Sequence, residues 1–231
     1  MHGVGYQSSV DVFKTFDHKP FVPVLQQIQP DPEFPTVKFP NPEEGKSALN
    51  LSIETANAHN STIILANDPD ADRLAVAEKL PDSTWKIFNG NEIGALLGWW
   101  LWYNFNQNNK SIEKNDVYMI YSTVSSNILN AIAQVEGFNS EDTLTGFKWM
   151  GNKAVELTRQ GKTVLLAFEE AIGFMCGTRV PDKDGITAEA VVAEMAVYLK
   201  AIEKRTLNEQ LDWIYNRQVK RLILFQTCLA C

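Results

Sequence analysis

Three carboxylates at alternate positions, Asp68, Asp70 and Asp72, are the side chains of this sequence best suited to chemistry. They directly follow the apolar run 62–66, and Arg73 comes immediately after the third of them. Because Mg²⁺ prefers hard oxygen ligands and often completes its octahedral shell with a phosphate oxygen, three acids beside one cation suit a site for a metal and a phosphate. An acidic, solvated turn after a strand is the simpler interpretation. We predict a Mg²⁺ site formed by the three aspartates, with the arginine beside it.

Two other kinds of acidic loop can be compared with this spacing. An EF-hand that begins at Asp68 requires glycine at its sixth position and glutamate at its twelfth. This chain has Arg73 and Lys79 at those positions, so the EF-hand interpretation fails. Phosphatases of the haloacid-dehalogenase type also place an Asp-x-Asp pair after an apolar strand, but Asp72 stands where their pattern has threonine or valine. The phosphatase interpretation is therefore weakened, although it stays open.

Polar side chains also gather where other predicted strands and helices end, as ligand groups usually do in α/β proteins. In the stretch 145–153, a threonine hydroxyl, a glycine backbone and lysines precede a helix, an arrangement that suits an anionic sugar phosphate. Adjacent acids at Glu169 and Glu170 end an apolar strand and could accept hydrogen bonds from vicinal sugar hydroxyls. Lys183, within the turn 182–185, is a candidate phosphate contact. A charged turn is the alternative interpretation of the last two stretches.

Composition limits the class of protein. The 231 residues could form one large domain or two small ones, and an apolar content of 45% is that of an ordinary globular protein. The chain carries 21 basic and 28 acidic residues, a net charge of −7, and has no basic cluster for a nucleic acid backbone. The longest apolar run, 93–103, is too short to span a membrane, and no charged-then-apolar leader opens the chain. We therefore expect a cytoplasmic protein without nucleic acid or membrane partners, and its oligomeric state stays open.

Apolar periodicity and turn residues predict a first group of elements, which position the acidic loop and end near residue 88. In order, these are a short helix capped at Ser8 or Ser9, an extended arm over the seven prolines of 20–42, a helix from Pro42 with Glu43 and Glu44 in its first turn, a strand at 62–66, and strands at 74–77 and 85–88 joined by a turn. The strand at 62–66 carries the acidic loop at its carboxyl end.

Strands that alternate with amphipathic helices predict a second group of elements around a substantially parallel sheet. In order, these are a helix at 91–105, a strand at 117–121, a helix at 125–135, a glycine-containing loop, a helix at 152–160, a strand at 163–168, a loop, a helix at 186–200 and a final helix at 207–216. We therefore predict two tandem α/β domains, 1–88 and 89–216, with mixed or largely parallel sheets flanked by helices. Residues 217–231 form a separate tail.

The acidic loop 68–73 resembles the metal-binding loop of the α-D-phosphohexomutases, and the stretch 169–173 resembles their sugar-binding loop. The stretches 31–38, 145–149 and 182–185 are similar to the phosphopentomutase-type branch of that family, which also includes glucose-1,6-bisphosphate synthase. The resemblance covers residues 1 to about 216 and corresponds to the second and third of four domains.

This resemblance implies a Mg²⁺-dependent enzyme that moves a phosphoryl group between C1 and the terminal carbon of a sugar through a phosphoserine and a sugar bisphosphate. The implied substrates are glucose, ribose or deoxyribose phosphates, with glucose 1,6-bisphosphate as activator. Asp68, Asp70 and Asp72 would hold Mg²⁺, and Arg73 would act catalytically beside the transferring phosphate. The implied substrate-binding residues are Thr145, Gly146, Lys148, Glu169, Glu170 and Lys183.

The chain departs from the family pattern in several places. Ala171 stands where many members have serine, so one hydroxyl contact to the sugar is missing. The Thr-x-Ser-His-Asn-Pro-type segment that carries the catalytic serine and the Arg-x-Ser-Gly-Thr-type phosphate loop are both absent, and the tail from Arg217 leaves the pattern. We therefore expect a fragment of a mutase that is inactive alone. The glucose-1,6-bisphosphate synthase branch and a non-catalytic fragment that binds sugar phosphates are the alternatives.

Overall fold

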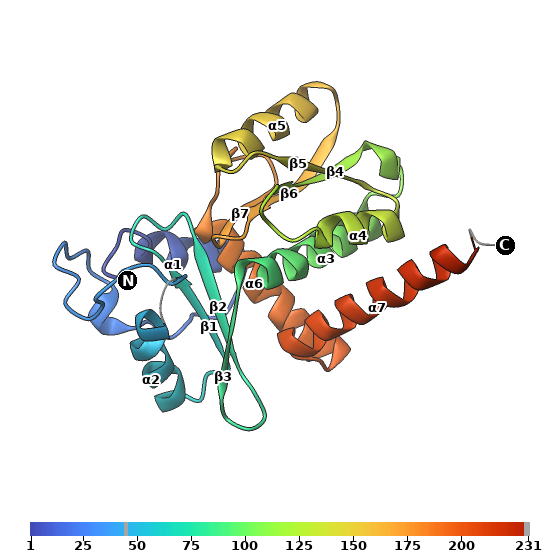
Figure 1. Ribbon diagram of the computed structural model, residues 1–231. Helices are drawn as coiled ribbons and strands as arrows, with labels where there is room; N and C mark the ends of the chain where they lie inside the picture. The colour runs from blue at the N-terminus through green and yellow to red at the C-terminus, as the bar shows by residue number, and fades with distance from the viewer. Residues whose placement is uncertain (44–45, 229–231) are drawn as a thin grey trace.

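The computed structural model describes residues 1–43 and 46–228 and contains two β-sheets. The first sheet has three antiparallel strands in the order β1-β2-β3, formed by β1 (Ile63–Asn67), β2 (Leu74–Lys79) and β3 (Trp85–Phe88). Its register places Leu65 opposite Val76, and Val76 opposite Phe88. Because β1 and β2 are joined only by residues 68–73, the acidic loop is the connection of a β-hairpin (Figure 1).

The second sheet has four strands in the order β5-β4-β6-β7. Its members are β4 (Val117–Ser122), β5 (Asn139–Thr143), β6 (Thr163–Glu169) and β7 (Gly173–Cys176). The strands β5, β4 and β6 run parallel and β7 runs antiparallel to β6, so the sheet is mixed, as expected. The carboxyl ends of the three parallel strands therefore lie at one edge of this sheet.

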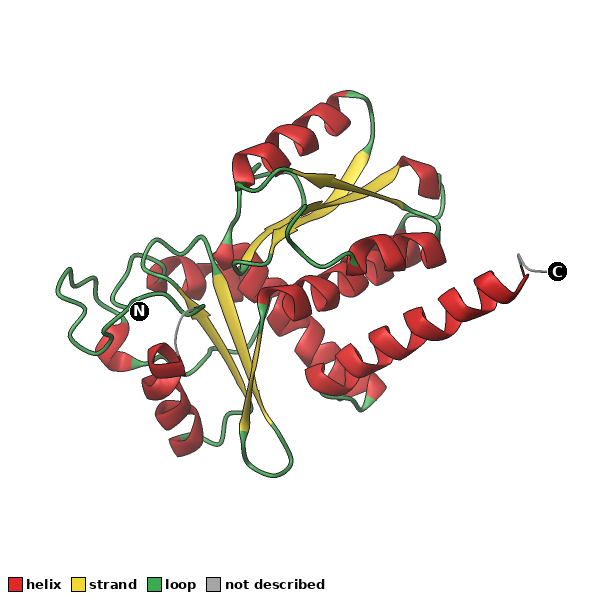
Figure 2. Ribbon diagram, viewed as in Figure 1, coloured by secondary structure: helices red, strands yellow, loops and turns green. Residues whose placement is uncertain are grey.

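Helices cover both faces of the second sheet (Figure 2). On one face, Ile120, Ala167 and Met175 pack with apolar residues of α5 (Phe147–Arg159). On the other face, alternate residues such as Met119 and Phe168 pack in a core with α3 (Gly90–Asn108) and α4 (Ile128–Glu136). This alternation follows from the two-residue period of a β-strand.

The two sheets share one hydrophobic core. Buried side chains of the first sheet, such as Leu74, belong to the same cluster as Phe168 of the second. The helix α6 (Gly185–Tyr198), followed by a π-helical turn at Leu199–Glu203, contacts β1, β2 and β7 and so connects the sheets. The remaining helices are α1 (Tyr6–Thr15), α2 (Asn50–Ala58) and α7 (Leu207–Cys228), with short 3-10 turns at Leu25–Gln27, Lys46–Leu49 and Lys114–Asp116.

The predicted α/β class is confirmed, but one helix begins later than predicted. The helix predicted from Pro42 starts at Asn50, after a 3-10 turn. The reason is local, because the side chain of Asn41 accepts a hydrogen bond from the backbone N–H of Glu43 at 3.1 Å and forms a turn there. The prediction for Glu44 falls outside the described residues.

Two strands were missed, and several further helix boundaries differ. α1 begins at Tyr6, so Ser8 and Ser9 lie inside the helix and do not cap it, and α4 begins at Ile128, three residues later than predicted. β5 replaces part of the predicted glycine-containing loop, and its polar residues are tolerated because it is an edge strand with partly exposed side chains. β7 is a strand of four residues that pairs antiparallel with the end of β6. α5 begins at Phe147, five residues earlier than predicted, because Phe147 and Met150 are buried on the sheet. α7 continues through the predicted end at 216 to Cys228.

Candidate metal and sugar-phosphate site

The hairpin loop between β1 and β2 turns sharply enough to bring its acids together. Ala71 has a φ of 62°, in the left-handed region, and its backbone N–H donates to the carbonyl of Asp68 at 3.1 Å. The side-chain amide of Asn67 donates to the carbonyl of Arg73 at 3.1 Å and closes the loop. As a result, one carboxylate oxygen from each of the three aspartates lies within 4.8 Å of the others.

The three carboxylates fit a magnesium ion. Ligand oxygens around an octahedral Mg²⁺ at about 2.1 Å lie roughly 3–4 Å apart, so small side-chain rotations would let these three oxygens surround the ion. Asp68 is 1% exposed, whereas Asp70 is exposed and Asp72 half-buried, so one side of the site is open to water or phosphate. Burial raises the pKa of the Asp68 carboxyl above its ordinary value, and hydrogen bonds from Arg73 partly oppose this.

Arg73 pairs with two of the aspartates. Its Nε lies 2.6 Å from Oδ2 of Asp68, and its backbone N–H donates to Oδ1 of the same carboxylate at 3.1 Å. The guanidinium also donates to Oδ1 of Asn41 at 3.1 Å and lies 3.7 Å from Asp72. Because its side chain stays 25% exposed, the arginine neutralises the buried acid while remaining accessible to an anion.

Residues between β6 and α6 reach this loop. Arg73 and Gly173 form an isolated antiparallel bridge, and the N–H of Leu74 donates to the carbonyl of Ile172 at 3.1 Å, so the loop after β6 is paired with the end of the acidic loop. Nζ of Lys183 lies 3.1 Å from Oδ2 of Asp72. A Cβ on Gly173 would lie 2.9 Å from both Glu169 and Lys183, so these two side chains pack together over a bare backbone.

The Glu169 carboxyl packs beside Lys183 over Gly173. Burial raises the pKa of its carboxyl, and the nearby positive charge of Lys183 opposes this. The structure thus brings Glu169 and Lys183 to the acidic loop and Arg73, as a site for both a sugar and a phosphate requires.

The Glu170 carboxylate binds residues outside the acidic loop. Its Oε2 accepts hydrogen bonds from the hydroxyls of Ser122 at 3.0 Å and Ser125 at 2.9 Å. Its backbone N–H donates to Oγ of Ser125 at 2.9 Å. Glu170 therefore holds the end of β4 against the end of β6, and its predicted contact with a sugar remains a prediction.

The predicted residues Thr145, Gly146 and Lys148 lie where β5 ends and α5 begins. Since β5 and β6 are both parallel to β4, this helix start lies at the same sheet edge as Glu169. Thr145 and Lys148 are exposed, and Gly146 has a φ of 104°. Within residues 1–43 and 46–228, no hydrogen bond or ion pair connects these three residues to the acidic loop.

Sequence reasoning missed several polar residues of the site. Asn41 binds Arg73, Asn67 closes the loop, and Ser122 and Ser125 bind Glu170. Only Asn41 had a recognisable signal, because an asparagine held between Pro40 and Pro42 has a restricted backbone. Asn67 and the two serines have no distinguishing local pattern.

Two sequence models of one protein family match this chain. The sequence model described as phosphoglucomutase/phosphomannomutase, alpha/beta/alpha domain II, matches residues 1–80, and that of domain III matches residues 89–217. This chain belongs to the phosphoglucomutase/phosphomannomutase family. Both the acidic loop and the loop after β6 lie inside the matched ranges, so the candidate site is formed by the family's own segments.

Relatives within the phosphoglucomutase/phosphomannomutase family have two kinds of names. A phosphopentomutase of Mus musculus is 57% identical over 218 residues, and a glucose 1,6-bisphosphate synthase of Homo sapiens is 52% identical over 217 residues. The matches cover 93% and 94% of this chain, but the chain spans only about 35% of the length of either relative. A phosphoglucomutase/phosphomannomutase family protein of Burkholderia thailandensis shares the fold with a TM-score of 0.68 at 19% identity, over 92% of this chain and 41% of that one.

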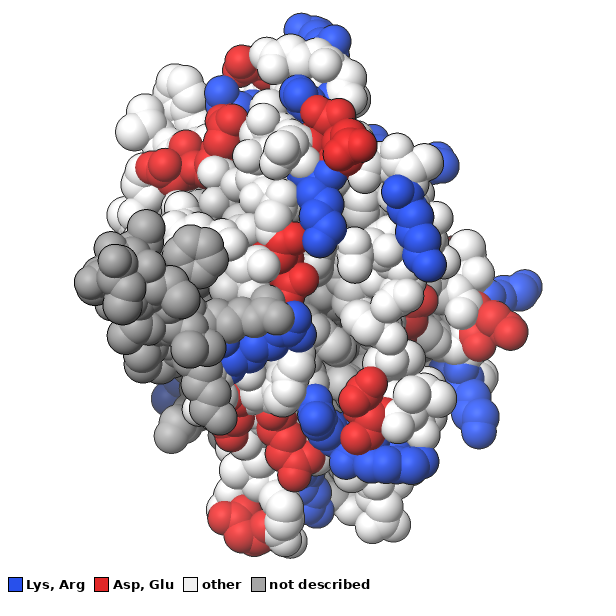
Figure 3. All heavy atoms as spheres, turned by 90° about the vertical axis from the view of Figure 1, so that its right-hand side faces the viewer, with Lys and Arg blue, Asp and Glu red and all other residues white. Residues whose placement is uncertain are grey.

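Charged residues of both signs share one face of the molecule (Figure 3). On the described part of the face in Figure 3, Lys and Arg side chains are interspersed with Asp and Glu. Among the helices that the structure describes, none is both long enough and apolar enough to cross a membrane.

Proposed function

We propose that this chain forms the metal-binding region and part of the sugar-phosphate-binding region of a Mg²⁺-dependent phosphosugar mutase. The observation that carries the proposal is the pairing of Arg73 with Gly173, because it places the acids of one loop beside Glu169 and Lys183 of the other half. The division into domains at 1–88 and 89–216 belongs to the same proposal. The family matches at 1–80 and 89–217 support it.

Each group has a role that follows from its chemistry. Asp68, Asp70 and Asp72 would hold Mg²⁺, which when bound neutralises negative charge on a transferring phosphoryl group. Arg73 and Lys183 add positive charge for the phosphate, and Glu169 accepts hydrogen bonds from sugar hydroxyls. The start of α5 offers a second anchoring group at the same sheet edge, formed by Thr145, Gly146 and Lys148.

The substrate class we propose is a glucose, ribose or deoxyribose phosphate, with a sugar bisphosphate as intermediate and a phosphoserine as carrier. Phosphopentomutases and glucose 1,6-bisphosphate synthases are similar to this chain at comparable identity, so both remain candidates for the whole protein. We favour the mutase, because Ala171 removes a hydroxyl contact and leaves the site less committed to hexoses. A cytoplasmic location stays a prediction.

Magnesium binding is the first test of this proposal. We expect Mg²⁺ to raise the unfolding temperature of the chain, and Asp70→Asn to weaken its apparent affinity by roughly tenfold or more, because one of three charged ligands is lost. Asp70 is exposed and outside the Arg73–Asp68 pair, so its replacement leaves that pair intact. The measurement is a titration followed by calorimetry and by thermal unfolding.

The matched control is Asp212→Asn, which removes an exposed acid on α7. This variant should bind Mg²⁺ as the unchanged chain does. Equal affinity in all three proteins would show that the ion binds somewhere other than the acidic loop.

Turnover is the second test. With ribose 1-phosphate or glucose 1-phosphate as substrate and glucose 1,6-bisphosphate as activator, we expect no product above the enzyme-free blank, because the sequence contains no segment of the catalytic-serine type. The measurement is a coupled assay or phosphorus NMR. Product formation that requires Mg²⁺ and disappears in Asp70→Asn would refute the expectation that this chain is inactive alone.

A further inference from the structure

Two nitrogens of the Arg73 guanidinium are bound by other residues of the chain. Nε lies 2.6 Å from Oδ2 of Asp68, and Nη1 donates to Oδ1 of Asn41 at 3.1 Å. Within the described ranges 1–43 and 46–228, Nη2 donates no hydrogen bond. Because the Arg73 side chain is 25% exposed, the N–H groups that remain on Nη1 and Nη2 are accessible to a ligand.

The two contacts restrain the guanidinium differently. A partner at Nε alone permits rotation about the Nε–Cζ bond, because this rotation keeps Nε in place and exchanges the positions of Nη1 and Nη2. A hydrogen bond at Nη1 opposes the rotation, since the planar group must break that bond in order to turn. Asp68 therefore anchors the group, whereas Asn41 fixes its rotation and with it the direction of Nη2.

Asn41 is itself held in place by its neighbours in the sequence. Its Oδ1 accepts a second hydrogen bond, from the backbone N–H of Glu43 at 3.1 Å. Pro40 and Pro42 flank the asparagine and restrict its backbone, and Pro42 is buried. Both lone pairs of the amide oxygen are thus used by N–H donors, so the oxygen that Arg73 meets has one well-defined position.

The segment before Asn41 is attached to the rest of the molecule at other points. Oγ1 of Thr36 lies 2.8 Å from Nε2 of His2 and accepts a hydrogen bond from Nε2 of Gln27 at 2.8 Å. Val37 is buried. A side chain at a functional site is held precisely where its supporting residues are packed and hydrogen-bonded. Residues 36–42 therefore provide a fixed support for Asn41.

An amide oxygen orients Arg73 without adding charge. The guanidinium already pairs with Asp68, and its Nε lies 3.7 Å from Oδ1 of Asp72. A further carboxylate at position 41 would accept the same hydrogen bond, but it would also weaken the attraction of the guanidinium for an anion. Asparagine supplies the hydrogen bond and leaves that positive charge available.

We propose that Asn41 is a positioning residue, which fixes the rotation of the Arg73 guanidinium so that Nη2 is available to the phosphate group of a sugar phosphate. The inference rests on the proposed function, because it takes Arg73 as a phosphate contact. It adds to the site a residue that lies 32 positions before Arg73 in the sequence. Asn41 acts through Arg73 and needs no contact with the ligand.

The first measurement is made without a ligand. NMR of the isotope-labelled chain reports how fast the Arg73 guanidinium rotates about Nε–Cζ, because the rotation exchanges the Nη1 and Nη2 signals. We expect Asn41→Ala to speed this exchange by roughly tenfold, as loss of one hydrogen bond allows. Asn57→Ala is the matched control, since Oδ1 of Asn57 also accepts from two donors, Nζ of Lys79 and Nε1 of Trp85. An unchanged exchange rate in Asn41→Ala would overturn the proposal.

The second measurement is the affinity for glucose 1,6-bisphosphate in the presence of Mg²⁺, by calorimetry. Asn41→Ala should weaken this affinity by roughly fivefold and leave the affinity for Mg²⁺ unchanged, because the hydrogen bonds of Asn41 go to Arg73 and Glu43. Asn41→Asp should restore the slow rotation but still bind the bisphosphate weakly, and its loss should shrink at high salt. Full recovery of bisphosphate affinity in Asn41→Asp would overturn the argument from charge.

Combined variants test whether Asn41 acts through Arg73. Arg73→Lys keeps a positive charge beside Asp68 but has no Nη atoms, so adding Asn41→Ala to it should cause no further loss of bisphosphate affinity. An equal loss from Asn41→Ala in both backgrounds would overturn the proposal and leave the proposed function standing. Unchanged bisphosphate affinity in Arg73→Lys itself would overturn both, since Arg73 would then not bind the phosphate.

Discussion

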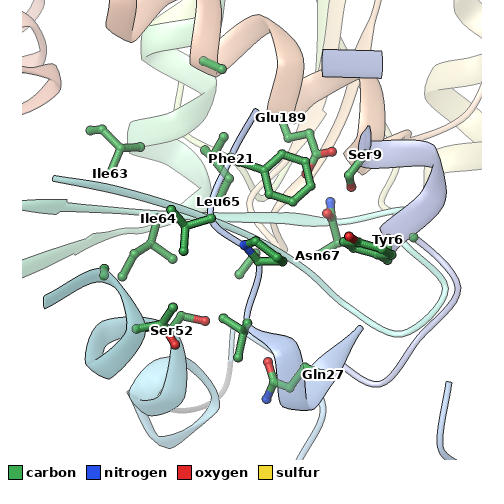
Figure 4. A pocket seen from close by; sticks show the side chains of 18 of the residues that line it. Tyr6, Ser9, Phe21, Gln27, Ser52, Ile63, Ile64, Leu65, Asn67 and Glu189 are labelled. Carbon is green, nitrogen blue, oxygen red and sulfur yellow. The ribbon is translucent and has the colours of Figure 1, made fainter. Parts of the chain in front are cut away.

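Replacement of Glu189 by glutamine should stabilise this chain by roughly 2–3 kcal/mol at about pH 8 and remove the loss of stability that this carboxyl causes between about pH 5 and pH 8. Glu189 is only 3% exposed, and its Oε1 has no hydrogen-bond partner in the part of the chain that the structure describes. Its side chain lines a cavity of about 430 Å³ beside β1 and points toward Ser9 (Figure 4). Burial raises the pKa of its carboxyl from 4.5 to about 7, and the hydroxyl of Ser9 opposes this only in part.

The sign of the effect follows from proton binding. Between pH 4.5 and about 7, the folded chain keeps the Glu189 proton that the unfolded chain has already released. Stability therefore falls as the pH rises through this window, and above it the folded state holds an unpaired buried carboxylate. Glutamine has a similar shape and no charge, so stability should no longer fall with rising pH for this reason.

Urea unfolding at several pH values measures this effect. Glu54→Gln, at an exposed position on α2, is the control and should leave the pH dependence of the unfolding free energy unchanged. If Glu189→Gln behaves like the control, the carboxyl is solvated in solution and burial does not raise its pKa.

Replacement of Gly185 by alanine should destabilise the chain by about 3 kcal/mol and weaken Mg²⁺ binding. A Cβ at this position would lie 2.4 Å from the carbonyl oxygen of Arg73, 2.7 Å from Nδ2 of Asn67 and 2.8 Å from the carbonyl oxygen of Ala71. Two of these atoms belong to the backbone of the acidic loop and cannot rotate away. The start of α6 and the loop must therefore move apart, and the 3.1 Å hydrogen bond from the N–H of Gly185 to Ala71 is lost with them.

Urea unfolding and a Mg²⁺ titration together measure this result. Gly161→Ala is the control, because Gly161 has a φ of +78° but no atom within 4 Å of its added Cβ. In that variant the free energy of unfolding should fall by only roughly 1–2 kcal/mol, which is the cost of a left-handed backbone conformation for alanine. Its Mg²⁺ binding should be normal. Equal losses in the two variants would mean that backbone conformation, and not the contact with the acidic loop, decides the effect.

Local patterns of apolar and polar residues were sufficient to predict many of the helices and strands of this chain. The apolar run 62–66 followed by alternating aspartates predicted a strand with acids at its carboxyl end, and β1 and its loop have that arrangement. The antiparallel hairpin of β2 and β3 and the long helix α3 were predicted for the same reason, since their periodicities are those of a strand and a helix.

Helices and strands whose conformation depends on contacts with residues distant in the sequence could not be predicted. β5 consists of Asn139–Thr143 and has no apolar alternation, so only pairing with β4 makes it a strand. The side chain of Asn41 also binds Arg73, which lies 32 positions further along the chain. No local sequence pattern indicates such long-range contacts.

The sequence by itself determined the charged groups available to the candidate site, because residue type decides what a side chain can bind. It placed three aspartates, an arginine, a glutamate pair and a lysine in segments 68–73, 169–170 and 182–185. Only the tertiary structure decided which of these side chains lie together. The bridge from Arg73 to Gly173 brings Glu169 and Lys183 to the acidic loop, whereas Glu170, one residue away, turns to Ser122 and Ser125. Side chains on adjacent residues of an extended chain point in opposite directions, and which direction meets the acidic loop depends on how the two sheets pack.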